Sequence, residues 1–484
     1  MNSNNFINLD AKLATLCASF IFVAVFFFNF SAFYIGSEIN QFFISSIFSI
    51  CLILPYIVHL LSRLEFSLFE RFTIIVWIFI KYFFAYIYYF EIWNGLDGPF
   101  KYLAYSDHLA FHNWAIFFSN YWKSTGVFFI PMDVLRSQTI NYPVSAYLFG
   151  GIYYLFGHYP SVILPWLSAV QFIVAYIALL VFSYSDLPVR YSKFVFYFIL
   201  WSPIFWIVTL LIHRDIFLLF GILIIFLGYI LVVGRKSFLT GIFFVLFGSF
   251  FVLNLRAEML FSVALFFVYA VISNILNTKK IIFKILISFL FILIVFLFYN
   301  VIYGNLSFLY VPKYDLNANI FLLLDKYLSK LQNAGKIYGI IMSLGGIFLV
   351  PIVLPFKFLV GLLAPFPWNF SSFQLIVTQP FYSLESILRV SIFIMVLYNF
   401  FICKSSYKFS TFGHHLRMFG FFLLLPALFG PKGEARYMLP SIPFLILMAN
   451  DHVFKFKNWI IVFFISLFVI FSLHILYYTI VSFV

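Results

Sequence analysis

The stretch HRDIFLLFGILIIFLGYILVVGRK, residues 213–236, decides the class of fold. Its residues 216–233 carry no charge, and charged residues close the run at both ends. A helix needs about 20 apolar residues to cross the hydrocarbon core of a bilayer. Similar runs recur from Leu13 to Val484, and they lack the alternation of membrane β-strands. Because only helices then satisfy the backbone in lipid, the sequence predicts an all-α, polytopic integral membrane protein.

The composition agrees with this class. Hydrophobic residues make up 64% of the 484 residues and aromatic residues 24%, and the mean hydropathy is +1.07, which excludes a soluble globular protein. The net charge of +13 comes largely from short loops, where Lys and Arg orient spans and meet anionic headgroups. A bilayer is therefore the predicted partner, and nucleic acid is not. Cys17, Cys51 and Cys403 stand singly, so neither a disulfide framework nor a thiolate metal site is predicted.

We expect one transmembrane domain over residues 1–484, with about 13 to 15 spans. The first apolar run lacks a small-residue cleavage site and is predicted to be a retained span. Two apolar stretches, residues 143–157 and 358–387, are left open between crossing and re-entrant or interfacial segments. The remaining spans are predicted near residues 13–34, 42–62, 72–92, 160–183, 194–212, 216–233, 238–254, 259–277, 285–302, 337–356, 388–403, 418–430, 438–450 and 459–482.

The distribution of Lys and Arg predicts the orientation of these spans. Basic residues mark cytoplasmic loops at residues 62–71, 190–193, 234–236, 278–280, 404–417 and 455–457. The loops between them then face outward. Two are long: residues 93–142, expected to hold interfacial helices, and residues 303–336. The short outer loops are His213-Arg-Asp215, Arg256-Ala-Glu258 and Lys432-Gly-Glu-Ala-Arg436. Charges kept inside apolar surroundings are costly and are functional candidates.

The first candidate site lies in Tyr105-Ser-Asp-His-Leu-Ala-Phe-His112. Helical spacing there groups Asp107 with His108 and His112. Asp107 is predicted as a catalytic base that takes a proton from a sugar hydroxyl, with His112 as a second catalytic residue and His108 binding substrate. The alternative is a solvated aspartate or a helix cap. His108 and His112 stand four residues apart, which can hold a metal, but no third ligand stands at a familiar spacing. No metal ligands are predicted, and the cofactor stays unknown.

Two arginines at short outer turns are predicted to bind a phosphate. Arg214 is followed by Asp215, and Arg256 stands two residues before Glu258. Because the guanidinium group is planar and stays charged, it donates several hydrogen bonds to a phosphate. We assign all four residues to substrate binding. The alternative is a structural ion pair at the membrane interface in each case.

A third cluster, Lys432-Gly-Glu-Ala-Arg-Tyr437, stands between two prolines, which makes it a constrained turn. Lys432 and Arg436 are predicted to clamp a phosphate or pyrophosphate, with Glu434 orienting them and Tyr437 alongside. For the lysine alone, a snorkelling anchor is the alternative. Lys81, midway along the third apolar run, is left open between snorkelling, pairing with a carboxylate inside the bundle and facing a lipid-phosphate cavity.

These stretches resemble the GT-C superfamily of membrane glycosyltransferases. The segment around Asp107 is similar to the acidic outer-loop motif of that family. Residues 141–150, NYPVSAYLFG, resemble the Pro-containing start of its next hydrophobic segment, and residues 434–443, EARYMLPSIP, resemble a late Arg-Tyr-x-x-Pro-x-x-Pro segment. The chain departs from the pattern by having two spans before the one that precedes the Asp107 loop, and it includes no large soluble C-terminal domain.

The resemblance implies transfer of a sugar or oligosaccharide from a polyprenyl-phosphate or polyprenyl-diphosphate donor at the outer face of the cytoplasmic membrane. It gives Asp107 the role of the catalytic acidic residue, and Arg436 and Tyr437 that of a lipid-phosphate element. O-antigen and capsule polymerases are similar in the same general way. The alternative is a lipid-linked oligosaccharide flippase, which predicts charges spread through the depth of a central cavity. The sugar, the acceptor, the choice between polymerase and single-sugar transferase, and the oligomeric state stay open.

Overall fold

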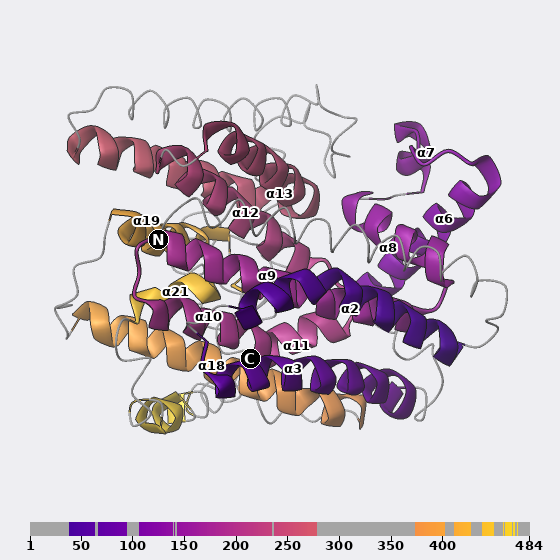
Figure 1. Ribbon diagram of the computed structural model, residues 1–484, viewed down its shortest axis with the longest axis horizontal. Coiled ribbons are helices and arrows are strands. Elements are labelled where there is room, and N and C mark those ends of the chain that lie inside the picture. Colours follow the sequence, from indigo (N-terminus) through magenta and orange to yellow (C-terminus); the bar gives the residue numbers. More distant parts are fainter. Residues whose placement is uncertain are drawn as a thin grey trace, which may run out of the picture. The chain divides into compact units, whose positions relative to one another are not determined.

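The computed structural model describes residues 38–62, 66–93, 106–138, 140, 143–234, 237–277, 373–401, 411–426 and 438–449, and residues 458, 460–466, 468, 469 and 472 (Figure 1). Every regular element in this part of the chain is a helix. In order, they are α2 (Glu38–Ser62), α3 (Leu68–Tyr86), η1 (Ile87–Trp93), α6 (Ser106–Thr125), α7 (Met132–Ser137), α8 (Pro143–Phe156), η2 (Pro160–Val162), α9 (Ile163–Tyr184), α10 (Val189–Trp201), α11 (Pro203–Leu210), α12 (Asp215–Val233), α13 (Phe238–Asn277), α18 (Phe373–Phe401), α19 (Thr411–Phe422) and α21 (Ile442–Met448).

Five of these helical stretches are long and apolar enough to cross a membrane. They are Glu38–Ser62, Leu68–Phe90, Pro160–Tyr184, Asp215–Val233 and Phe238–Arg256. The chain is a multi-pass membrane protein. This confirms the predicted class, and each of the five lies near a predicted span. The total of about 13 to 15 spans stays a prediction, because the spans near 13–34, 285–302 and 337–356 and the outer loop 303–336 fall outside the described residues.

Contacts between residues divide the chain into two compact units. Unit 1 contains Met1–Tyr176 and Val208–Ile216, and unit 2 contains Ile177–Ile207 and Phe217–Val484. Each unit is described by itself.

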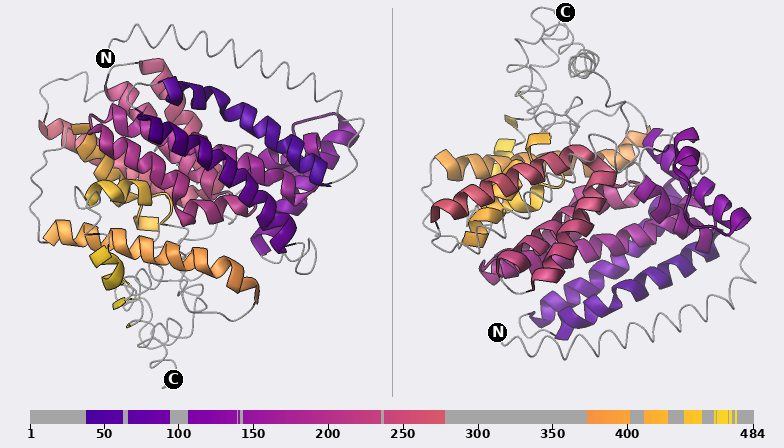
Figure 2. Two further views of the ribbon diagram at one scale, coloured as in Figure 1. Left: turned by 60° about the horizontal axis from the view of Figure 1, so that its bottom comes forward. Right: turned by 90° about the horizontal axis from the view of Figure 1, so that it is seen from above.

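In unit 1, α2 packs against α3 and α8, and α6 lies along α8 (Figures 1 and 2). The start of α3 is fixed by a capping box, in which Ser67 and Glu70 exchange side chain to backbone hydrogen bonds. α6 and α7 occupy the predicted outer loop 93–142, and neither is among the candidate spans. α8 covers the open stretch 143–157 with 14 residues, a length of about 21 Å, which is less than the hydrocarbon core of about 30 Å.

In unit 2, α12 and α13 pack through facing glycines. Gly221 lies against Gly248, and Gly228 lies against Gly241. Since the first numbers rise while the second fall, the two helices run antiparallel. A Cβ added at Gly228 would lie 2.6 Å from the Gly241 carbonyl oxygen and 2.8 Å from the Val245 nitrogen. Small residues of this kind let two helices approach closely inside a bilayer, where the hydrophobic effect does not drive helices together.

α13 reverses direction at Arg256, whose φ of −155° and ψ of 87° interrupt the helix. Before this break, Gly241 contacts Gly228 of α12. After it, Phe266 and Phe267 contact Tyr229, the neighbour of Gly228. Both halves of α13 therefore pass the same end of α12, so the chain folds back between them. This matches the predicted separation of spans 238–254 and 259–277.

The glycine contact gives a stability prediction. Gly228→Ala should lower the free energy of unfolding by on the order of 2 kcal/mol, because backbone atoms of α13 occupy the space for the new methyl group. Gly151→Ala is the matched control, since a Cβ there meets nothing within 4 Å and alanine favours the helix by about 1 kcal/mol. Equilibrium unfolding in mixed SDS micelles measures both. Equal effects of the two substitutions would contradict the tight α12–α13 contact.

Three predicted spans differ from the structure. The span near 194–212 is two helices, α10 and α11, bent by 49° at Ser202–Pro203, where proline removes a backbone donor. Residues 373–387 belong to the same helix as the span near 388–403, because α18 is continuous over 29 residues. The span near 438–450 contains only the seven-residue α21, which begins with Pro443 inside its first turn.

Candidate functional site

The junction between α11 and α12 carries the predicted residues Arg214 and Asp215, and it belongs to unit 1. Residues 211–214 lie outside the helices, and Asp215 is the first residue of α12. Asp215 is fully buried, and its Oδ2 lies 3.1 Å from Nδ1 of His213. An acidic residue in the first turn also interacts favourably with the helix dipole. The junction therefore has a fixed, buried geometry.

This junction packs on α6 through Phe111, which is buried. The guanidinium carbon of Arg214 lies 5.9 Å from the centre of the Phe111 ring, within the range of a cation–π contact. The His213 ring meets the same phenyl ring edge to face, with centroids 6.2 Å apart. Arg214 is only 7% exposed. The segment around residue 111 and the segment around residue 214 therefore form one cluster in unit 1, which we call the α6–α12 site.

Asp107 is the second residue of α6 and stands four residues before Phe111. A separation of four residues is about one helical turn, or roughly 6 Å along the axis. The backbone of Asp107 is thus one turn from the ring that contacts Arg214. The side chains of Asp107 and His108 lie outside the described part of the structure. Their predicted roles stay predictions.

His112 is held by α8. Its Nδ1 lies 2.6 Å from the hydroxyl of Tyr153, which is fully buried. Two residues after the end of α8, Nε2 of His158 lies 2.8 Å from the Ser119 hydroxyl of α6. Burial, with a smaller contribution from His158, lowers the pKa of His112 to about 4. Burial and then Lys123 lower the pKa of His158. His112 is therefore a neutral hydrogen-bonding group at pH 7 and can accept a proton only weakly.

The described structure does not place the remaining predicted site residues relative to the α6–α12 site. Arg256 is 2% exposed at the reversal of α13 and belongs to unit 2, and the Glu258 side chain is not described. Lys432, Glu434, Arg436 and Tyr437 lie outside the described residues. The predicted convergence of all these groups on one chamber stays a prediction.

Lys81 has a definite environment that the sequence left open. It is fully buried in α3, and its Nζ donates a hydrogen bond of 2.7 Å to Thr209 Oγ1. Thr209 in turn donates to Oε1 of Gln171 on α9, at 2.9 Å, and both residues are fully buried. Snorkelling is therefore excluded, and Lys81 pairs inside the bundle. Thr209 stands four residues before His213, so this Lys81–Thr209–Gln171 chain anchors the α11–α12 junction to α3 and α9.

Sequence reasoning missed Thr209, Gln171, Phe111 and Tyr153. Gln171 had a detectable signal, since it is the one amide side chain in the apolar run 160–183. The other three gave none, because hydroxyl and aromatic residues are common in these runs. Among the described residues, no group of three His, Cys, Asp or Glu side chains could hold a metal ion.

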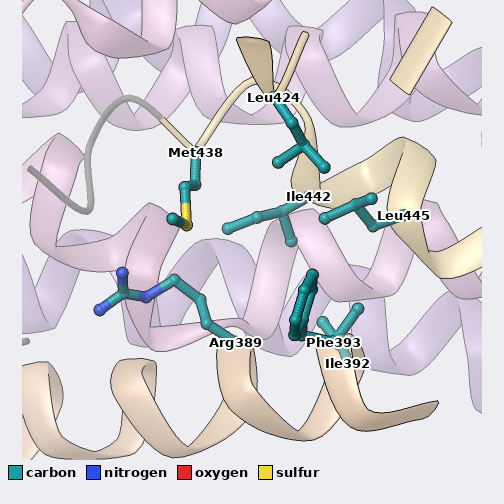
Figure 3. Close-up of a pocket in the computed structure, with 7 residues that line it drawn as sticks. All are labelled: Arg389, Ile392, Phe393, Leu424, Met438, Ile442 and Leu445. Carbon is teal, nitrogen blue, oxygen red and sulfur yellow. The ribbon is translucent and has the colours of Figure 1, made fainter. Parts of the chain in front are cut away.

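Unit 2 contains a small pocket beside Arg389 (Figure 3). The arginine is buried, and its Nη2 donates to Ser386 Oγ at 3.4 Å. The other lining residues are apolar: Ile392, Phe393, Leu424, Met438, Ile442 and Leu445. None of the predicted site residues that the structure describes lines this pocket. Arg389 stands four residues after Glu385 on α18, a spacing that indicates a structural pair, and the Glu385 side chain is not described.

Comparison with known proteins leaves the family open. No protein-family model matches the chain, and no significant match exists among curated proteins or solved structures. The GT-C resemblance therefore rests on the short stretches quoted from the sequence.

Proposed function

We propose that the chain is a membrane glycosyltransferase that takes a sugar or oligosaccharide from a polyprenyl-phosphate or polyprenyl-diphosphate donor. The reaction takes place at the outer face of the cytoplasmic membrane. The observation that carries the proposal is the contact of Arg214 with Phe111. It joins a buried arginine to the helix that bears Asp107 one turn away. A carboxylate and a guanidinium group on neighbouring elements are what transfer from a lipid phosphate needs.

In this mechanism, Asp107 takes the proton from the acceptor hydroxyl, and the oxygen attacks the anomeric carbon. The bond from that carbon to the phosphate oxygen breaks, and the electron pair leaves with the lipid phosphate. Arg214 stabilises the charge that develops there, because a preorganised cation in a water-poor site acts strongly on it. Direct displacement inverts the anomeric configuration. Arg256, Lys432 and Arg436 add to the phosphate site in the proposal.

Asp215 holds His213 beside Arg214 and so fixes the junction that presents the arginine. His112 is neutral at pH 7 and hydrogen-bonded to Tyr153, so it orients substrate hydroxyls by hydrogen bonding while Asp107 acts as the base. Glycan acceptor and lipid donor are the partners, and the isoprenoid tail lies against apolar helices.

A flippase for lipid-linked oligosaccharides is the second candidate, and Lys81 favours it. The residue places a polar chain in the middle of a span rather than at a span end. Transport proteins use such intramembrane polar groups along a substrate path. In the glycosyltransferase proposal, the same chain anchors the junction of Arg214.

One experiment separates the two candidates. The purified protein is reconstituted in liposomes with radiolabelled polyprenyl-phosphate or polyprenyl-diphosphate sugars and an acceptor glycan. Glycosyl transfer gives a new glycosidic bond, seen as one added residue or a ladder of products. A flippase makes the labelled headgroup accessible on the opposite leaflet without a new bond. The proposal fails if headgroups move and no glycosidic bond forms.

A further inference from the structure

The loop between α6 and α7 exposes three apolar side chains in a row. Val127 is 50% exposed, Phe128 64% and Phe129 66%. We call these three residues the apolar tip. Single exposed apolar residues are ordinary on a protein surface, but a contiguous aromatic group marks an interaction site. Tyr154 of α8, 36% exposed, extends the group, because its ring lies 6.0 Å from that of Phe128.

The tip has a defined conformation that hydrogen bonds hold in place. α6 ends with Gly126, whose φ of +69° is the left-handed conformation that closes a helix, and its N–H donates to the Trp122 carbonyl. The Trp122 indole N–H donates to the Phe128 carbonyl at 2.9 Å. The Ile130 N–H donates to the Tyr147 hydroxyl at 2.9 Å. Both sides of the tip are thus tied to the α6–α8 pair.

Part of the backbone around the tip is paired within the protein. Val127 N–H donates to Thr125 Oγ1, and Thr125 and Ser124 donate to the Tyr121 carbonyl. The N–H groups of Phe128 and Phe129 make no such hydrogen bond in the described structure. Because an unpaired backbone group costs several kcal/mol in hydrocarbon, the tip suits the headgroup region, where water still reaches the backbone.

The surroundings of the tip match the membrane interface. The indole of Trp122 and the phenol of Tyr147 lie beneath it, with rings 5.9 Å apart and stacked. This pair supports the tip from within the protein, because Trp122 is buried. Tyr154 is exposed beside Phe128, and tyrosine concentrates at the level of lipid headgroups. Lys123, exposed on the last turn of α6, supplies a positive charge for lipid phosphates.

We propose that the apolar tip inserts into the headgroup and upper acyl region of the bilayer, anchoring the α6–α8 pair to the membrane surface. The bilayer is chosen over a glycan because the tip presents three apolar side chains in a row, whereas a sugar site needs polar groups placed among its aromatic ones. Neither α6 nor α7 is a candidate span, so the anchor supplements the spanning helices.

A fluorescence experiment tests the tip directly. Cys17, Cys51 and Cys403 are replaced by serine, and Phe129→Cys is labelled with an environment-sensitive fluorophore in reconstituted liposomes. Ser137→Cys on α7, also exposed, is the matched control. We expect lipids with a spin label near the headgroup to quench most of the Phe129→Cys emission, and aqueous iodide to quench little of it. The control should show the opposite preference.

Two outcomes would overturn the proposal. Iodide quenching of the position-129 label as strong as that of the control would place the tip in water. A label protected from both quenchers would place it against protein, such as a second copy. Neither outcome depends on glycosyl transfer, so the anchor and the proposed function are tested separately.

Discussion

Asp107→Asn should lower glycosyl transfer by about 100-fold to 10,000-fold, the usual contribution of a general base. The amide keeps the size of the side chain but cannot take the proton from the acceptor hydroxyl. The variant should insert in the membrane and unfold like the original protein, because Asp107 is the second residue of α6 and asparagine suits the start of a helix as well as aspartate does. Initial rates of product formation with reconstituted protein measure the effect.

Asp133→Asn is the matched control for this experiment. Asp133 lies in the same predicted outer loop, in the first turn of α7, and is exposed. It should retain full activity. In parallel, Arg214→Gln should lose about 100-fold in rate, as other groups that stabilise developing charge do. Arg214→Lys keeps the positive charge but lacks the planar guanidinium group. Its rate should therefore lie between those of the original protein and Arg214→Gln. Full activity of Asp107→Asn would remove this residue from the mechanism.

Thr209→Val should lower the free energy of unfolding by about 3 kcal/mol, because it leaves two buried polar groups, the Lys81 amine and the Gln171 carbonyl, without this partner. Valine has the shape of threonine but cannot accept from Lys81 Nζ or donate to Gln171 Oε1. All three side chains are fully buried, so water cannot replace the lost hydrogen bonds. Equilibrium unfolding in mixed SDS micelles measures the loss.

A second substitution shows whether this loss of stability comes from the Lys81 amine, which Thr209→Val leaves without its threonine partner. Lys81→Met removes the amine that donates to Thr209. Replacing both partners of a buried hydrogen bond by apolar groups lowers the free energy of unfolding only a little. The double variant Lys81→Met/Thr209→Val should therefore be more stable than Thr209→Val alone. Thr209→Ser keeps the hydroxyl and should stay close to the original protein. Simple addition of the two single effects would contradict the hydrogen-bonded chain.

The sequence predicted best the features that depend on where charged residues end or interrupt an apolar run. The span near 216–233 is α12, Asp215–Val233, because charged residues close it on both sides. The interruption between residues 254 and 259 was predicted for the same reason, and Arg256 is where α13 reverses. Prolines explain two of the differences, at Pro203 and Pro443, since apolar length alone does not show where a helix breaks.

Contacts between distant segments could not be predicted. Lys81 and Thr209 are separated by 128 positions, and several threonines and serines in apolar runs were equally good partners. The contact of Phe111 with Arg214 could not be predicted either, because the sequence contains 75 Phe residues and nothing in it singles out Phe111 as the partner of Arg214. The types of residues in the candidate site were thus predictable, and their pairings were not.

The reversal of α13 has a consequence for how the protein is inserted during synthesis. The half that follows Arg256 is helical to Asn277 and contains the apolar helix Met259–Ser273. Carrying an arginine through the bilayer costs a translocon several kcal/mol. We therefore expect the two halves to leave the translocon together as a helical hairpin, with Arg256 at the tip between them. Chains released between the halves would be expected to stall there and be degraded.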